Sequence, residues 1–102
     1  MRNEEYYIDK SGAKVYLNSE KQPELPIENG QRICYVLNAG LDIKGIPTVT
    51  IEEDGKYNCY RIPEQLAEWV QTLVGFASMG EKVLPSKVMF TKKDGSWYAD
   101  IL

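Results

Sequence analysis

The chain carries few of the side chains that usually perform catalysis. It contains no histidine, which excludes histidine-based triads, histidine general bases and metal sites that need imidazole. Its serines therefore have no histidine base, and none of them lies in a nucleophile-elbow pattern. Cys34 and Cys59 lie in strand-like runs without a C-x-x-C spacing. We expect them to be buried, unreactive free thiols, with a disulfide or a reactive thiol as the alternative.

Two other segments resemble chemical motifs but lack the groups that would complete them. Residues 40–45 contain two glycines, as phosphate-binding loops do, but Pro47 follows instead of the Gly-Lys-Ser/Thr ending and a helix N-terminus. The contiguous acids Glu52, Glu53 and Asp54 fall at a predicted hairpin tip, where carboxylates are normally solvated and unsuited to acid–base catalysis. The sequence therefore predicts a protein that is not an enzyme and that uses no metal or cofactor.

Acidic and aromatic side chains carry more information. The chain has seven tyrosines and two tryptophans, and tyrosine is enriched at protein interfaces, although it is also a good strand former. Acidic groups could steer the chain towards a basic partner, such as a nucleic-acid enzyme. The sequence predicts a binding module that covers a surface of another protein, as inhibitors, immunity proteins, antitoxins and anti-defence proteins do. The predicted protein-binding residues are Glu20, Glu24, Glu28, Glu52, Glu53, Asp54, Tyr57, Tyr60 and Tyr98.

Binding of single-stranded nucleic acid is the alternative function. Single strands are bound by positive charge along a groove combined with stacking aromatic rings. The C-terminal third offers such groups, and the residues concerned are Lys82, Lys87, Lys92, Lys93 and Trp97. The net charge of −3 and the many exposed acids expected elsewhere would repel phosphate. Alternatively, the lysines form a solvated face that keeps edge strands from pairing.

Length and composition indicate one folded domain spanning residues 1–102. Apolar residues make up 43% of the chain and charged residues 26%, which are ordinary values for a globular protein. The first residues lack the apolar run of a signal peptide, and no segment reaches the roughly 18 apolar residues of a membrane-spanning helix. We therefore expect a cytoplasmic protein that does not contact membranes.

Turn signals divide the chain into strands. Asp-Gly or Asp-x-x-Gly between strand-like runs predicts a hairpin, because these residues tolerate the positive φ of tight turns. Three such turns occur, at residues 9–12, 53–56 and 93–96. Residues 31–37 form a further predicted strand, and residues 38–45 a connecting loop. Residues 18–30, with three glutamates and two prolines, predict an exposed acidic loop.

One amphipathic helix is predicted over about residues 63–79. Pro63 suits a first helical turn, and Gly80 suits a C-terminal cap. Between them an apolar stripe recurs at helical spacing, formed by Leu66, Trp69, Val70, Leu73, Val74 and Ala77. The fold class is therefore α+β, with a mainly antiparallel sheet of about six to seven strands built from hairpins and the helix packed on one face.

Several predicted strands are apolar on both faces. Ile33 and Tyr35, with Leu37, share one face of their strand, while Cys34 and Val36 share the other. One helix about 25 Å long can cover two or three strands on one side only. The second face could be buried by curling of the sheet into a half-barrel, by the acidic loop, or by another molecule, including a second copy in a homodimer.

Overall fold

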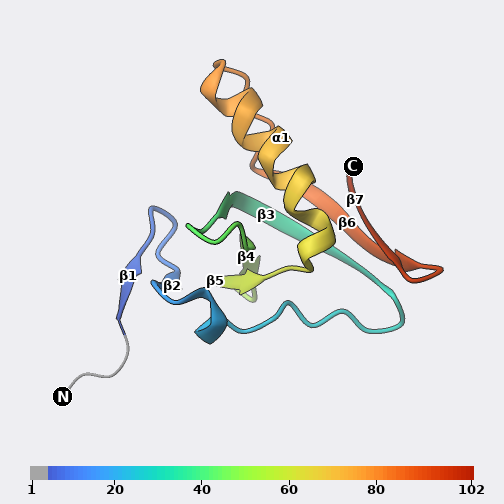
Figure 1. The fold of residues 1–102 in the computed structure, drawn as a ribbon, viewed down its shortest axis with the longest axis horizontal. Coiled ribbons are helices and arrows are strands. Elements are labelled where there is room, and N and C mark those ends of the chain that lie inside the picture. The colour runs from blue at the N-terminus through green and yellow to red at the C-terminus, as the bar shows by residue number, and fades with distance from the viewer. Residues whose placement is uncertain (1–4) are drawn as a thin grey trace.

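Seven strands and one long helix make up the fold in the computed structural model, which describes residues 5–102 (Figure 1). The strands are β1 (Tyr6–Ile8), β2 (Lys14–Tyr16), β3 (Gln31–Leu41), β4 (Pro47–Glu53), β5 (Lys56–Arg61), β6 (Ser86–Lys93) and β7 (Ser96–Ile101). The helical segments are η1 (Ser19–Lys21), η2 (Glu64–Leu66) and α1 (Ala67–Ser78). The α+β class is therefore confirmed.

The strands form two antiparallel sheets. β1 and β2 pair with each other, and the other five strands are ordered β5-β4-β3-β6-β7. The three predicted hairpins are confirmed. Asp54 and Asp94 have φ values of 49° and 53°, and the glycine after each has φ 79°, which is the conformation that favours Asp-Gly in two-residue turns. The larger sheet stays open, with β5 and β7 at its edges, and does not close into a barrel.

β3 is longer than the sequence predicts, because residues 38–41 continue the strand instead of starting a loop. Its pairing with β4 skips one residue between Val36 and Asn38, so Leu37 has no partner. Such a bulge bends the strand and re-aims the extra side chain. Strict alternation of side chains is interrupted at this bulge, so the register supports the predicted shared face only for Ile33 and Tyr35.

The helix matches its predicted segment closely. η2, a 3₁₀ turn, runs directly into α1, and the two occupy most of residues 63–79. Leu66, Val70 and Leu73 of the predicted apolar stripe are buried. Gly80, with φ 87°, follows the helix as a C-terminal cap. Within residues 5–102, no helix is long and apolar enough to cross a lipid bilayer.

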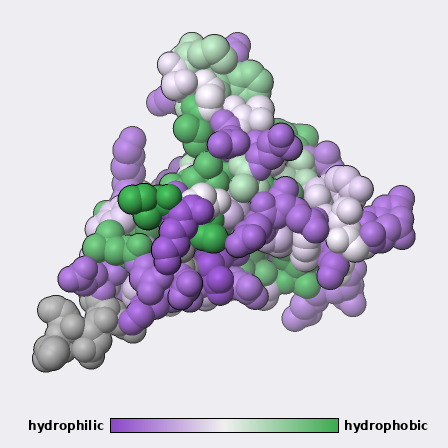
Figure 2. All heavy atoms as spheres, in the orientation of Figure 1, coloured by the Kyte–Doolittle hydropathy of each residue, from purple (hydrophilic) through white to green (hydrophobic). Residues whose placement is uncertain are grey.

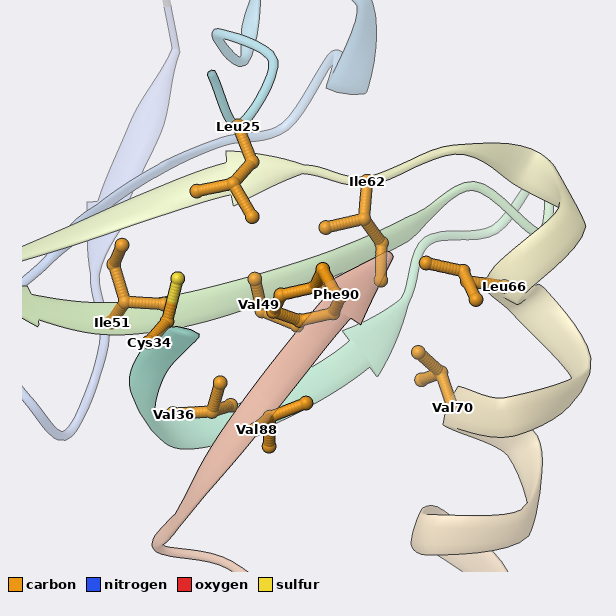
Figure 3. Close-up of a cluster of buried hydrophobic side chains, with 10 residues drawn as sticks. All are labelled: Leu25, Cys34, Val36, Val49, Ile51, Ile62, Leu66, Val70, Val88 and Phe90. Atoms are coloured by element: carbon orange, nitrogen blue, oxygen red, sulfur yellow. The ribbon is translucent and has the colours of Figure 1, made fainter. Parts of the chain in front are cut away.

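The core lies on the side of the larger sheet that faces α1 (Figure 3). Phe90 has no exposed surface and packs edge-on against Trp69 of α1, with ring centroids 5.8 Å apart. Leu25 joins the same cluster from the segment before β3. The remaining buried members are Cys34, Val36, Val49, Ile51, Ile62, Leu66, Val70 and Val88.

The acidic segment of residues 18–30 is held against the sheet. The backbone N–H of Leu25 donates to the carbonyl of Arg61 over 2.9 Å, and the N–H of Arg61 donates to the carbonyl of Pro23 over 2.8 Å. The segment therefore continues the sheet beyond β5 for a short distance, and Leu25 is buried. The glutamates remain exposed as predicted, at Glu20, Glu24 and Glu28. The segment therefore exposes its acidic side chains, while its backbone is held by hydrogen bonds to Arg61.

The β1–β2 hairpin packs on the other side of the larger sheet. One oxygen of the Asp9 carboxylate accepts a hydrogen bond from the Thr50 hydroxyl of β4 over 2.8 Å. The other oxygen accepts from the backbone N–H groups of Ser11 and Ala13, at 2.9 Å each, and Ala13 is fully buried. The hairpin thus covers part of β4 and β5, around Thr50 and Cys59, on the face that α1 does not reach.

Gln22 fastens this hairpin, and Gln22→Ala is expected to lower the free energy of unfolding by about 2 kcal/mol. Its amide donates to the carbonyls of Lys14 (3.0 Å) and Cys59 (2.9 Å), and its side-chain oxygen accepts from the N–H of Tyr16 (2.8 Å). The side chain is only 2% exposed, so its removal leaves backbone groups unpaired away from water. Urea unfolding measures the loss. Gln71→Ala, on the exposed side of α1, is the control, and equal losses in the two variants would contradict this role.

Candidate functional site

Part of the second sheet face has no covering element within residues 5–102. The β1–β2 hairpin lies over only part of β4 and β5, and on this face side chains of all five strands of the larger sheet, including Glu52 of β4 and Tyr57 of β5, remain open to solvent. We name this surface the open face and define it by Ile33, Tyr35, Tyr57, Met89 and Tyr98. Ile33 is 55% exposed, Tyr98 51%, Tyr35 43% and Tyr57 41%. Contiguous apolar and aromatic surface of this kind commonly marks an interaction site.

The strand register makes the open face continuous. Side chains directly opposite one another on neighbouring antiparallel strands have Cβ atoms about 4.5–5.5 Å apart. The pairs on this face are Ile33 with Met89, Tyr35 with Glu52, and Glu52 with Tyr57. Tyr98 of β7 lies on the same side, since its partner Thr91 is two residues from Met89. All five strands of the larger sheet therefore contribute side chains to this one surface.

The charges on this face have both signs. Glu52 lies between Tyr57 and Tyr35 in the register, and Lys87 lies on the other side of Tyr35. Asp100 of β7 faces the same side. An apolar and aromatic centre with charged groups of both signs around it is the usual composition of a protein interface. It differs from the continuous positive track that binds a nucleic-acid strand.

The structure brings some of the predicted protein-binding residues together. Tyr57, Tyr98 and Glu52 all lie on the open face, and Asp54 is exposed in the adjoining β4–β5 turn. Glu53 is placed differently. It comes two residues after the buried Ile51 and therefore lies on the helix-facing side of the sheet.

Glu53 and Tyr60 form part of a hydrogen-bonded network on that side. One carboxylate oxygen of Glu53 accepts from the Tyr60 hydroxyl (2.5 Å) and the Asn58 amide (2.8 Å), and the other pairs with the Arg32 guanidinium at 2.6 Å. Burial alone would raise the pKa of Glu53, but the hydrogen bonds from Tyr60, Arg32 and Asn58 together lower it. Burial and the adjacent Glu53 raise the pKa of Tyr60 to about 12. The network leaves neither Glu53 nor Tyr60 on the open face.

The loop glutamates lie elsewhere. Glu24 is paired at 3.7 Å with Arg61 at the outer edge of β5, and Glu20 belongs to η1. Glu28 precedes β3, where its carbonyl accepts a hydrogen bond from the N–H of Gln31. These three acids belong to the anchored segment of residues 18–30, whereas the tyrosines of the open face lie on β3, β5 and β7.

The predicted nucleic-acid-binding residues are divided between different surfaces. Lys92 lies over the ring of Trp97 at 5.7 Å from the centroid, and Trp97 packs against the core on the helix-facing side. Lys87 and Lys93 alternate to the opposite side of β6. Lys82 lies in the loop after α1. The five groups therefore do not form a single basic and aromatic surface.

Both cysteines are buried free thiols, as predicted. Cys34 belongs to the core cluster, while Cys59 lies opposite Thr50 on the other face of the sheet. The sheet therefore separates the two sulfur atoms. Burial raises the pKa of each thiol, which keeps them in the less reactive protonated form.

Sequence reasoning did not select Ile33, Tyr35 and Met89 as binding residues. Their signal is present in the sequence, because Ile33 and Tyr35 alternate with buried side chains of the same strand. That alternation shows that they share a face but not whether the face is covered. Only the position of the β1–β2 hairpin decides that question.

The chain as a whole matches no protein-family model, no curated protein and no solved structure.

Proposed function

We propose that this protein is a non-enzymatic binding module that acts in the cytoplasm by covering a surface of another protein, in the manner of an inhibitor, immunity protein, antitoxin or anti-defence protein. The open face is the single observation that carries the proposal. Tyrosine and aliphatic anchors at the centre of an interface supply most of its binding energy. Two buried free cysteines are consistent with a reducing compartment.

The open face favours a protein partner over a nucleic acid. Its centre is formed by aromatic and aliphatic groups, and its charges, such as Glu52 and Lys87, have opposite signs. A nucleic-acid strand would need several cations along one path, whereas the lysines of the C-terminal third point to different sides of the fold. The net charge of −3 adds to the repulsion of phosphate.

The acids beside the open face suit a partner with a basic surface. Glu52 lies within the face, and Asp54 lies in the turn next to it. Charged groups at the rim of an interface mainly increase the rate of association and select the partner. A basic nucleic-acid enzyme is therefore a suitable target class. The alternative is that two copies of this chain associate through their open faces and form a homodimer.

Site-specific photocrosslinking tests the proposal. A photoreactive amino acid at position 35 or 98 is expected to give a crosslink to a partner protein in the native host, because both side chains lie on the open face. The same group at Gln71, exposed on α1, is the matched control. In the purified complex, Tyr35→Ala is expected to raise Kd about thirty-fold, the effect of losing roughly 2 kcal/mol at a central anchor.

Each alternative gives a distinct result. A crosslink to a second copy, together with a dimer in light scattering, would identify the open face as a homodimer interface. Equal crosslinking from position 71 and position 35 would show that the open face is not the contact surface. If the protein shifts the mobility of a labelled oligonucleotide at low salt, and Tyr35→Ala abolishes that shift, the open face would be a nucleic-acid-binding site instead.

A further inference from the structure

A groove distinct from the open face lies between α1 and β3. β6 pairs with β3 only as far as Val36, whereas β4 pairs with it up to Leu41. Within the described residues, no strand therefore pairs with the β6-side edge of β3 from the bulge at Leu37 onwards. A groove of about 440 Å³ follows this free edge. Sites for small molecules have volumes of about 300–1,000 Å³.

The groove is lined mostly by apolar side chains. Leu37 and Ala39 of β3 line one part, and Leu73, Val74 and Ala77 of α1 line another. The helix extends beyond the sheet here (Figure 1), and Figure 2 shows pale and green atoms, of intermediate and apolar residues, at its projecting end. The second half of α1 therefore offers apolar surface that the protein core does not use.

The chain between α1 and β6 forms a further wall. Val83, Leu84 and Pro85 line it, and they add further apolar atoms. Leu84 also packs against the core cluster, so this wall is fixed to the body of the protein. β3, α1 and the chain after α1 therefore all contribute apolar side chains to the groove.

Two lysines give the groove a positive charge. Lys10, from the β1–β2 turn, and Lys82, from the chain after α1, both line it. In the described part of the chain neither makes an ion pair or a side-chain hydrogen bond. Among residues 5–102, no acidic side chain lines the groove. Two unpaired cations beside an apolar groove complement a ligand with an apolar tail and an anionic head.

We propose that this groove binds a single-chain carboxylate of medium length, its acyl tail along Leu37, Leu73 and Leu84 and its carboxylate at Lys10 and Lys82. The volume favours a small molecule over a segment of another protein, and the charge favours an anionic head over a neutral or cationic one. The site is separate from the open face, so this inference does not depend on the proposed function.

Titration with dodecanoate below its micellar concentration tests the site. In low-salt buffer we expect saturable binding of one molecule per chain, with backbone amide shifts in NMR spectra concentrated at residues 37–39, 73–77 and 82–85. Dodecyltrimethylammonium, which has the same tail and a cationic head, is expected to bind at least about ten-fold more weakly, because Lys10 and Lys82 repel it. Non-saturable binding, or equal affinity for the two amphiphiles, would overturn the proposal.

Surface variants separate the groove from general charge effects. Lys10→Glu with Lys82→Glu is expected to weaken dodecanoate binding by about ten-fold, from the loss and reversal of two exposed charges. Lys56→Glu with Lys93→Glu makes the same change in net charge on exposed residues outside the groove and should leave the affinity nearly unchanged. Equal weakening by both pairs would overturn the assignment.

A steric variant and the oligomeric state complete the test. Ala77 is exposed on α1, so Ala77→Trp should fold normally and block the apolar tail. Tyr35→Ala, on the open face, should bind dodecanoate like the unmodified protein. A chain that is dimeric in light scattering, and that Ala77→Trp renders monomeric, would show that a second copy occupies the groove instead.

Discussion

Phe90→Ala is expected to lower the free energy of unfolding by about 4 kcal/mol, because it removes the largest fully buried side chain of the core. The ring has no exposed surface and packs edge-on against Trp69 at 5.8 Å. Its removal eliminates buried apolar area and the aromatic contact between the sheet and α1. It also leaves a cavity in the core. A domain of this size is stable by only about 5–15 kcal/mol.

Urea unfolding followed by tryptophan fluorescence and by circular dichroism measures this effect. Phe76→Ala is the matched control, because Phe76 is the other phenylalanine of the chain and is partly exposed on α1. We expect a loss of about 1 kcal/mol or less there. Similar losses at positions 90 and 76 would show that the core does not centre on Phe90.

Glu53→Ala is expected to lower the free energy of unfolding by about 3 kcal/mol near pH 7, since the substitution leaves a guanidinium, a hydroxyl and an amide without their shared acceptor. Glu53 binds Arg32 at 2.6 Å, Tyr60 at 2.5 Å and Asn58 at 2.8 Å. The adjacent Glu52 provides the control, because it is exposed on the open face. Glu52→Ala should change stability by less than about 0.5 kcal/mol.

The Glu53 network also predicts how stability depends on pH. The pKa of Glu53 is lower in the folded protein than its ordinary value of 4.5, so the stabilisation is fully present above pH 4.5. It is lost as the pH falls through the folded pKa. The stability of the unmodified protein should therefore fall more steeply on acidification than that of Glu53→Gln. Parallel curves would contradict the assignment.

Tyr60 gives the complementary dependence at alkaline pH. Its pKa is raised from 10.0 to about 12 in the folded protein, so the stabilisation is present below pH 10.0 and is lost as the pH rises towards 12. Ultraviolet titration of the tyrosines checks this, because the late component should disappear in Tyr60→Phe. Glu53→Gln should shift the same component to lower pH.

The elements that depend on local sequence were predictable. Asp54-Gly55 and Asp94-Gly95 require positive φ in two-residue turns, and the structure has it at both positions. The helix was predictable because its apolar stripe recurs at a period that only a helix brings to one face. The end of β3 was not, because Gly40 and the bulge at Leu37 interrupt the alternation without ending the strand.

The placement of distant segments was not predictable. The acidic segment was expected to be exposed along its length, yet Leu25 reaches the core and its backbone pairs with Arg61. Likewise, Glu52 and Glu53 read alike in the sequence. Only the pairing of β4 puts Glu53 beside Arg32 and Glu52 beside the tyrosines, because a shift of one residue exchanges the two faces.

The sequence predicted that an uncovered apolar surface exists, but not which residues bound it. The apolar character of both strand faces indicated surface in excess of what one helix covers, and the open face is that excess. Its limits depend on the β1–β2 hairpin, which is held by contacts between residues far apart in the chain, such as Asp9 with Thr50 and Gln22 with Cys59.

The extra residue in β3 also determines which single-residue deletions the strand can accommodate without exchanging its two faces. Val36 and Asn38 pair with consecutive residues of β4, so a chain lacking Leu37 would keep every other side chain of β3 on its present face. Deletion of another residue between positions 31 and 36 would instead transfer its neighbours across the sheet. Deletion of Leu37 would therefore change one wall of the groove beside α1, while the core and the open face keep their composition.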